Sequence, residues 1–446
     1  MRLPINTRVF YTLISALVIL GGAFLAIEFA KGNYRLTRNG YMAESGLLAA
    51  NSFPTGAEIY VDGNLLSATD DTIYLKPGEY QVEIVKDGYW PWKKTLLIQK
   101  ELVTQTNAQL FPIAPSLSPL SFAGVTNVTT SPDGQKLLYY VASASATTKN
   151  GLYVHELTDN FLSLQRGARQ VTNDPTATDL SQAQFIWAPD SSQVMVLTPE
   201  KDFVLELNEN QDITALPDIS FERTQLLSEW QEEMYIRERQ FMSKFPDEII
   251  DMATTSAKNV YISPDKKRLL YTATQQLTLP DNLVPPVPSP NNQPQERALV
   301  PGGIYVYDRE EDRNFRIGTE PLTNPYNKQL LATDLYQNRA LELEASPSAF
   351  RTLQATTSAQ TALNFSLYHT PLPLNTYQWF PDSKHVVYMT GNAVQIKGYD
   401  NTNDTTVYSG PFSNNFVYPW PDGSKLLILT SFNPETPANL YAIELK

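Results

Sequence analysis

The chain contains no cysteine in 446 residues and only three histidines. The first absence excludes disulfides and thiolate metal sites, although it does not identify a cellular compartment. The histidines, His155, His369 and His385, have no partner at the spacing of a metal site or a catalytic triad. The sequence also lacks the G-x-S-x-G, P-loop and H-E-x-x-H motifs. We therefore expect no enzyme, no cofactor and no metal site.

Positive charge is scarce outside the N-terminal segment. The whole chain has a formal net charge of −13, yet residues 1–38 carry five basic groups and one acidic group. The remaining residues are therefore even more acidic than the chain as a whole. Nucleic-acid binding needs clustered lysine and arginine, so we expect no nucleic-acid partner. The acidic balance is typical of a large domain that stays soluble.

The N-terminus contains the longest apolar run. No charged residue occurs from Val9 to Ile27, and about 20 apolar residues suffice to cross a bilayer as a helix. A cleaved signal peptide is the alternative, but its apolar core is usually shorter and ends in a small-x-small site. Cleavage after Ala30 would put Glu28 at the −3 position. We therefore favour an uncleaved anchor in residues 1–38, with the span at about residues 9–30.

A diverged repeat organises the rest of the chain. Five times an apolar or aromatic stretch runs into a Pro-Asp turn and continues as an apolar strand, which predicts a radial or stacked array. Proline suits the second position of a type I turn, and a small polar residue suits the first. The five turns are Ser131-Pro132-Asp133-Gly134, Ala188-Pro189-Asp190-Ser191, Ser263-Pro264-Asp265-Lys266, Phe380-Pro381-Asp382-Ser383 and Trp420-Pro421-Asp422-Gly423.

Most units continue into another strand of alternating character. These strands are Leu152–Leu157, Phe203–Leu207, Ile304–Asp308 and Leu440–Leu445. The repeat resembles the blade of β-propellers of the TolB and WD40-like type, in which an S-P-D-G turn joins two strands. This resemblance implies a mainly β propeller domain over residues 113–446. The intervals between successive turn prolines range from 40 to 117 residues, whereas a plain blade needs about 40 to 45. We therefore expect five or six blades with insertions.

Residues 46–112 form a separate small unit of strands and turns. Their order is strand, Asp62-Gly63 turn, Pro77-Gly78 turn, alternating strand, Asp87-Gly88 turn and strand. This order resembles the PEGA domain, whose Pro-Glu-Gly-Ala motif reads Pro54-Thr55-Gly56-Ala57 here. Threonine replaces glutamate, but the later L-x-P-G-x-Y and G-Y elements match. The resemblance implies a small β-sandwich on a surface-associated protein.

Trp90 and Trp92 are the candidate contact residues for a ligand or partner. They are two positions apart in a segment expected to be a strand, so both should point to one face. Such a pair suits an aromatic platform for a sugar ring or a partner surface. The simpler interpretation is that Tyr89 or Trp92 fills the small core and Trp90 covers its edge.

Three insertions interrupt the propeller repeat. Residues 221–251 have apolar side chains at helical spacing and predict an amphipathic helix or hairpin, packed on its own domain or free to dock a partner. Residues 322–372 also look partly helical. Residues 279–301 contain seven prolines and predict a solvated loop between strands, or a polyproline ligand for another protein.

The last repeat predicts how the propeller ring closes. After the turn at Pro421 the chain forms two further strands and stops at Lys446, which leaves the blade one strand short of four. An unpaired edge exposes backbone donors and acceptors. We expect part of residues 113–124 to supply the missing outer strand.

Together these features predict a membrane-anchored cell-surface protein whose propeller binds a protein or an envelope glycan. The basic residues are nearly balanced across the apolar span, so its extracytoplasmic orientation rests on the two family resemblances. Two alternatives remain open, because a fold does not determine a function. One is an envelope hydrolase or lyase with its site in the propeller channel, and the other is a purely structural scaffold.

Overall fold

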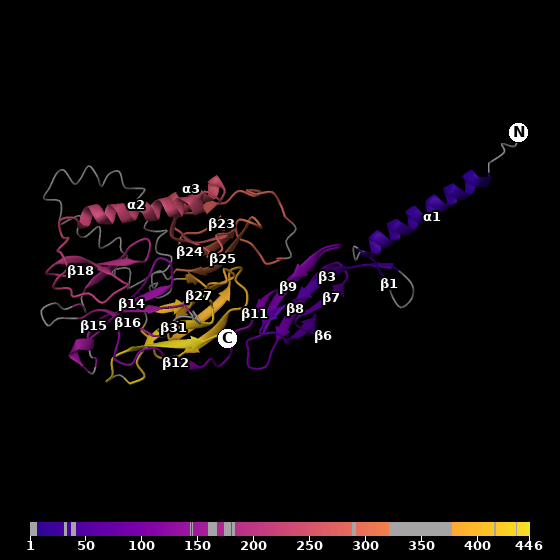
Figure 1. The fold of residues 1–446 in the computed structure, drawn as a ribbon. Coiled ribbons are helices and arrows are strands. Elements are labelled where there is room, and N and C mark those ends of the chain that lie inside the picture. The colour runs from indigo at the N-terminus through magenta and orange to yellow at the C-terminus, as the bar shows by residue number, and fades with distance from the viewer. Residues whose placement is uncertain are drawn as a thin grey trace. The chain divides into compact units, whose positions relative to one another are not determined.

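The computed structural model describes residues 7–30, 34–36, 42–142, 144, 146–158, 167–173, 180, 183–287, 291–320, 377–413, 416–433 and 435–446. The predicted insertion at residues 322–372 and His369 lie outside these ranges. Two compact units emerge: one extends to Phe111 and includes residues 291–293, and the other begins at Pro112 and contains the rest. Figure 1 shows both units.

The first unit begins with one long apolar helix, α1 (Thr7–Ala30). Its segment Phe10–Ile27 has a mean hydropathy of 2.2 and no buried residue, so it is long and apolar enough to cross a membrane. A secretory signal has the same properties. A short strand pair, β1 (Tyr34–Leu36) and β2 (Met42–Glu44), follows the helix.

Two sheets and a short strand pair form the small β-domain of this unit. The three-stranded sheet has the order β10-β3-β7 and the four-stranded sheet β6-β5-β8-β9. Alternate side chains from both sheets, among them Leu48, Ile59 and Ile84, form one buried core. The strands are β3 (Gly46–Ala50), β4 (Ser52–Phe53), β5 (Glu58–Val61), β6 (Asn64–Ala68), β7 (Asp71–Leu75), β8 (Gly78–Val85), β9 (Trp92–Ile98), β10 (Val103–Gln105) and β11 (Ala108–Gln109).

A segment of the Pro-rich loop completes the small domain. Asn291 is buried and forms a β-bridge to Leu96 of β9, and the Gln293 side-chain amide donates to the carbonyl oxygen of Thr95 at 3.2 Å. At the loop's two ends, β22 (Leu277–Thr278) pairs with β23 (Ala298–Leu299). Most described residues of 279–301 are exposed or partly exposed, as expected of a loop between strands. The loop is not solvated throughout, because Asn291 pairs with an edge strand and the two ends of the loop form a hairpin.

The second unit is a β-propeller. Its described residues form five blades, and consecutive strands within each blade pair antiparallel. Blade one is β13 (Thr126–Thr130), β14 (Lys136–Val141), β15 (Gly151–Glu156) and β16 (Arg169–Asn173). Blade two is β17 (Gln184–Trp187), β18 (Gln193–Leu197) and β19 (Asp202–Glu206). Blade three is β20 (Ala257–Ile262), β21 (Arg268–Ala273), β24 (Gly303–Asp308) and β25 (Arg313–Thr319). Blade four is β26 (Tyr377–Trp379), β27 (His385–Thr390), β28 (Ala393–Gly398) and β29 (Thr405–Ser409).

Blade five joins the two ends of the propeller sequence. Its strands are β30 (Val417–Pro419), β31 (Lys425–Thr430) and β32 (Asn439–Glu444), and β12 (Leu117–Pro119) adds the fourth strand. In this outer pair, Leu117 lies opposite Ile443 and Ser118 opposite Ala442. The predicted closure by residues 113–124 is therefore confirmed. It covers the edge of β32 that would otherwise expose its backbone groups.

The five Pro-Asp turns share one backbone geometry. In each, the fourth residue donates its N–H to the carbonyl of the first, at 2.8–3.0 Å. That fourth residue has a φ between 60° and 72° in every copy. Glycine adopts this conformation without cost and fills two of the five positions, whereas Ser191, Lys266 and Ser383 adopt it despite their side chains. The repeat therefore encodes a specific turn rather than a ligand site.

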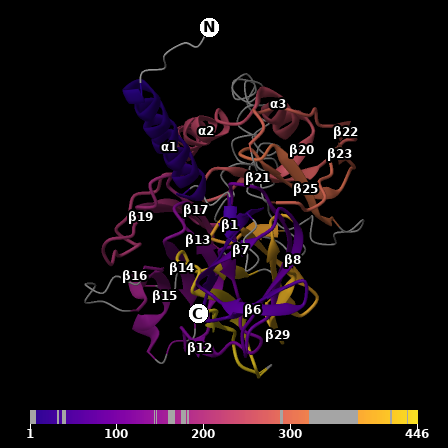
Figure 2. The same cartoon turned by 90° about the vertical axis from the view of Figure 1, so that its right-hand side faces the viewer.

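Two helices lie between blade two and blade three in the chain. They are α2 (Arg223–Met242) and α3 (Asp247–Thr255), and Pro246 is the N-cap of α3. Figures 1 and 2 both place them on the side of the propeller away from β12. One 3-10 turn, η1 (Thr147–Lys149), precedes β15.

Candidate interaction surface

The carboxylates of the Pro-Asp turns are occupied by their own turns. In each copy the aspartate Oδ1 accepts a hydrogen bond from the backbone N–H two residues later, at 2.7–3.0 Å. Backbone bonds also link neighbouring blades, since Asp133 N–H donates to Ser191 Oγ and Asp265 N–H to Ser383 Oγ. Among the described residues no three acidic or histidine side chains are grouped as a metal site would require.

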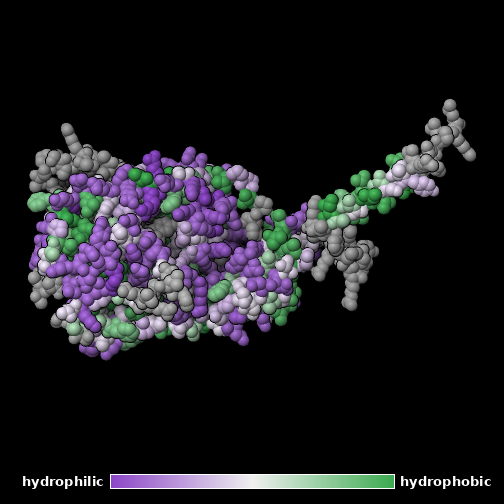
Figure 3. All heavy atoms as spheres, viewed as in Figure 1, coloured by the Kyte–Doolittle hydropathy of each residue, from purple (hydrophilic) through white to green (hydrophobic). Residues whose placement is uncertain are grey.

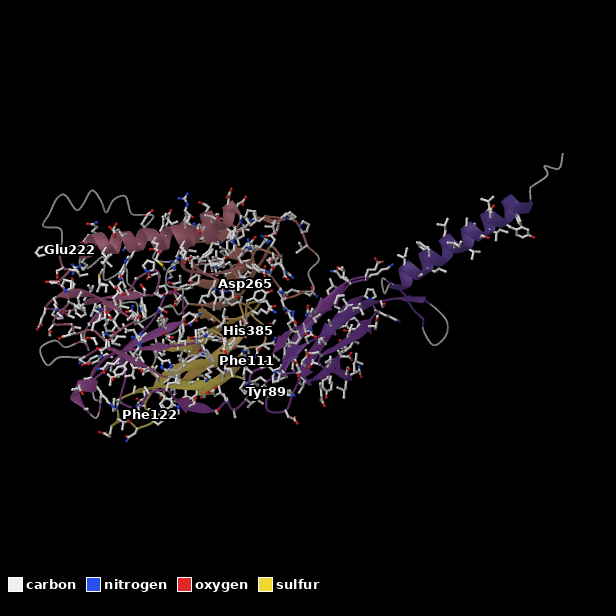
Figure 4. The ribbon with its side chains drawn as sticks, viewed as in Figure 1. Tyr89, Phe111, Phe122, Glu222, Asp265 and His385 are labelled. Carbon is white, nitrogen blue, oxygen red and sulfur yellow. The ribbon has the colours of Figure 1, made fainter. Side chains whose placement is uncertain are left out.

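The two described histidines pack within and between blades. The Nδ1 atom of His385, which is labelled in Figure 4, lies 2.6 Å from Asp382 Oδ2. The ring is buried and meets the ring of Phe380 edge to face. Burial would raise the pKa of Asp382, but the charge and hydrogen bonds of His385 lower it overall. His155 meets the ring of Trp420 edge to face at 6.2 Å, and burial lowers its pKa. Both histidines therefore have structural partners, one within its own blade and one on a neighbouring blade.

A narrow cavity lies between blades three and four. Its volume is about 10 Å³, room for about one water molecule, and its walls include Tyr261, Glu320 and Tyr377. Nearby, the buried Lys397 ammonium lies 5.0 Å from the centre of the Tyr377 ring and donates to Ile317 O and Asn401 Oδ1. This lysine joins β28 to β25 of the preceding blade. A cavity of this size holds no organic substrate.

The structure separates the two tryptophans singled out from the sequence. Trp92 is 8% exposed and belongs to the core of the small domain, whereas Trp90 is 36% exposed. Strand β9 begins only at Trp92. Trp90 lies in the preceding connection, where its backbone N–H donates to the backbone oxygen of Phe111. Strand alternation therefore does not apply to the pair, and the shared face expected from their spacing does not form. Tyr89, also labelled in Figure 4, packs partly against the same core.

Three exposed apolar side chains lie on two edge strands of the small domain. Strand β6 ends one sheet and β7 ends the other, and only Thr69 and Asp70 connect them. Leu65 and Leu66 of β6 are 56% and 48% exposed, and Tyr74 of β7 is also exposed. We call Leu65, Leu66 and Tyr74 the edge patch. Figure 3 shows hydrophobic residues on this domain and polar ones over most of the visible propeller face.

The geometry of β6 explains why both leucines face solvent. The register with β5 shifts between Ile59 and Tyr60, so that Leu66 is an extra residue in a β-bulge. Natural edge strands usually carry charge or proline that prevents pairing with another chain. The sequence of β6, Asn-Leu-Leu-Ser-Ala, has neither. Two adjacent leucines after an Asp-Gly turn were the available sequence signal, but strand alternation would have placed one of them in the core.

Comparison with known families identifies the small domain. Residues 45–113 match the PEGA domain family, which confirms the resemblance of the small domain. No curated protein matches the chain. Among solved structures, a putative TolB from Agrobacterium tumefaciens is 10% identical, with 71% of this chain and 76% of that chain covered and a TM-score of 0.20.

Two further solved structures show similarly distant likeness. TolB from Acinetobacter baumannii is 11% identical, with 82% of this chain and 60% of that chain covered and a TM-score of 0.18. An oligogalacturonate lyase in complex with manganese is 11% identical, with coverage of 86% and 82% and a TM-score of 0.21. At these scores the likeness supports no inference about a ligand or an activity. The chain thus carries a PEGA domain at residues 45–113, followed by a second unit with the strand arrangement of a β-propeller.

Proposed function

We propose that this protein is anchored in the cell membrane by α1, displays its two domains outside the cytoplasm, and binds a partner protein without catalysis. The edge patch of the small domain is the contact surface in this proposal. The exposure of Leu65 and Leu66 on an uncharged edge strand is the observation that carries it.

The proposed anchoring rests on the length and composition of α1. Helix α1 has 24 residues, and its apolar window is exposed throughout. An exposed apolar face of this extent is stable in a bilayer and unfavourable in water. Glu28 disfavours cleavage after Ala30, which supports an anchor over a removed signal.

The chemistry of the edge patch favours a protein over a glycan. Sugar rings bind flat aromatic faces assisted by polar groups, and the tryptophan pair that could provide such faces is divided between core and surface. Leucines on an edge strand suit a different partner, an extended peptide that adds a strand to the sheet. Its backbone would pair with β6, and its apolar side chains would cover the leucines.

Site-specific photo-crosslinking in living cells tests the proposed function. A photoreactive residue at Leu66 of the full chain should give a discrete adduct with one protein. The same residue at Glu79, which is exposed on β8 of the same domain, should give little or none. Leu65→Asp in the Leu66-labelled chain should abolish the adduct while leaving the amount of protein unchanged. Equal adducts from positions 66 and 79 would contradict the proposal.

A further inference from the structure

Helix α2 packs against two blades at once. Near its N-terminus, Leu227 lies in a buried cluster with Met195 and Leu197 of blade two. Near its C-terminus, Met242 belongs to a second cluster with side chains of β20, β21 and β24 of blade three. Figure 1 shows the helix extending from above β18 toward α3. Its docking therefore joins blade two to blade three.

Contacts from the two neighbouring turns hold the C-terminal third of the helix. The Arg237 guanidinium donates to Pro189 O in the turn of blade two at 2.8 Å. The Lys266 ammonium, in the turn of blade three, lies 3.8 Å above the centre of the Phe241 ring. Both contacts flank one residue of the helix, Glu238.

Glu238 occupies a buried position that would ordinarily hold an apolar side chain. It is 6% exposed and lies on the same stripe as Leu227 and Met242, the other buried residues of α2. Its Oε2 atom has no hydrogen-bond partner among the described residues. An unpaired carboxylate in such a place costs far more than a neutral carboxylic acid.

The charged groups around Glu238 already have partners of their own. Arg237 is held by Pro189 O and by Glu233 Oε1 at 3.1 Å, and Lys266 by the Phe241 ring. The carboxylates of the two adjacent turns are also engaged, Asp190 with Ser192 and Asp265 with Arg268. The positive charges of Arg237 and Lys266, which act on Glu238, would repel a metal ion. A proton is therefore the suitable ligand for this carboxyl group.

We propose that Glu238 is a proton-binding site that controls the docking of α2. In this mechanism the helix stays docked while Glu238 is neutral. Loss of the proton creates a buried charge, which the protein relieves by loosening α2 from the two blades. The pKa of Glu238 agrees with this role, because burial raises it to about 7 although Arg237 and Lys266 act to lower it.

The direction of the pH effect follows from this shift. The folded protein holds the Glu238 proton up to about pH 7, whereas the unfolded chain releases it near pH 4.5. Docking of α2 is therefore strongest at the acidic end of this range and weakens as the pH rises through about 7. The proposed location outside the cytoplasm would expose the domain to such changes directly.

Hydrogen exchange of the full chain in detergent tests this proposal. Backbone amides of residues 229–242 should be about tenfold less protected at roughly pH 8.5 than at roughly pH 5.5, after correction for intrinsic exchange. Glu238→Gln should keep protection at both pH values, because glutamine is neutral throughout. Glu232→Gln, at an exposed position of the same helix, should behave like the parent chain.

Two results would overturn the proposal. One is equal protection of α2 at both pH values in the parent chain, and the other is an unchanged pH effect in Glu238→Gln. If Glu238→Gln fails to fold, Glu238→Met replaces the carboxyl group with an apolar side chain that also cannot ionise. A pH effect in that variant equal to the parent's would overturn the proposal as well.

Discussion

The indole Nε1 of Trp379 donates to the backbone oxygen of Tyr261 at 3.0 Å, across 118 residues of sequence. Blade three contains Tyr261 and blade four contains Trp379, so these two blades pack directly against each other. The longest interval between Pro-Asp turns therefore does not separate blades three and four by another blade. An equivalent indole bond joins blades one and two, from Trp187 Nε1 to Thr129 Oγ1 at 3.2 Å.

Trp379→Phe should destabilise the propeller by about 1–3 kcal/mol, because a buried carbonyl loses its donor and the smaller ring leaves a gap. Trp187→Phe is the matched control, since Trp187 is less buried and its partner is a hydroxyl oxygen, which can turn to accept from another donor. Its cost should be smaller. Urea unfolding of both variants measures the difference. A Trp379→Phe variant as stable as the parent would show that the bond contributes nothing to blade packing.

The absence of cysteine allows the ring closure to be tested by an engineered disulfide. Ser118 on β12 and Ala442 on β32 lie directly opposite each other, at a separation typical of antiparallel pairs and compatible with a disulfide. Ser118→Cys combined with Ala442→Cys should oxidise readily and raise the Tm by about 5 °C or more, because the crosslink closes a loop of several hundred residues. Ser118→Cys alone should leave the Tm nearly unchanged. Failure of the pair to oxidise in the folded protein would contradict the closure.

The different positions of Trp90 and Trp92 predict different costs of truncation. Trp92→Ala should destabilise the small domain by about 3–5 kcal/mol, because it opens a cavity in the core. Trp90→Ala should cost less than about 1 kcal/mol. Thermal unfolding followed by tryptophan fluorescence distinguishes the two. Similar costs for both variants would mean that Trp90 is also a core residue.

The Asp382–His385 pair should make stability depend on acidic pH. Because the pKa of Asp382 is lowered in the folded protein, the pair contributes stability above the ordinary value near 3.8 and loses it as the pH falls further. Asp382→Asn should cost about 1–3 kcal/mol at neutral pH and progressively less below about pH 4. Denaturant unfolding at several pH values measures this convergence. A constant difference between variant and parent would show that ionisation of Asp382 is irrelevant.

The propeller could be predicted from the sequence because its signal is local and repeated. The turn at Ser131 and its four copies encode a backbone conformation that needs no distant partner, and the closure followed from one missing strand. The bridging role of α2 could not be predicted, since helical spacing gives no information about which blades a helix contacts. The burial of Glu238 could not be predicted either, because glutamate is ordinarily a surface residue.

In the small domain the fold could be predicted from the sequence, but the exposure and burial of particular residues could not. Its family was evident from the spacing of Pro-Gly and Asp-Gly turns, and the simpler interpretation of the tryptophans, with Trp92 in the core and Trp90 at its edge, agrees with their burial. The exposure of Leu66 depends on a bulge, and the burial of Asn291 depends on a partner strand nearly 200 residues away in the sequence. The adjacent leucines after the Asp-Gly turn do not reveal the bulge, and the burial of Asn291 leaves no pattern in its own neighbourhood.

Maleimide labelling of single cysteines in intact cells tests the proposed function most directly. The full chain lacks cysteine, so Leu66→Cys and Glu79→Cys each provide one reactive position, the first in the edge patch and the second outside it. A membrane-impermeant maleimide should label position 79 rapidly in intact cells and position 66 slowly, because a partner covers the edge patch. Both positions should react at similar rates in the purified protein. Labelling of neither position before lysis, or equal labelling of both in cells, would contradict an outward-facing domain with an occupied edge patch.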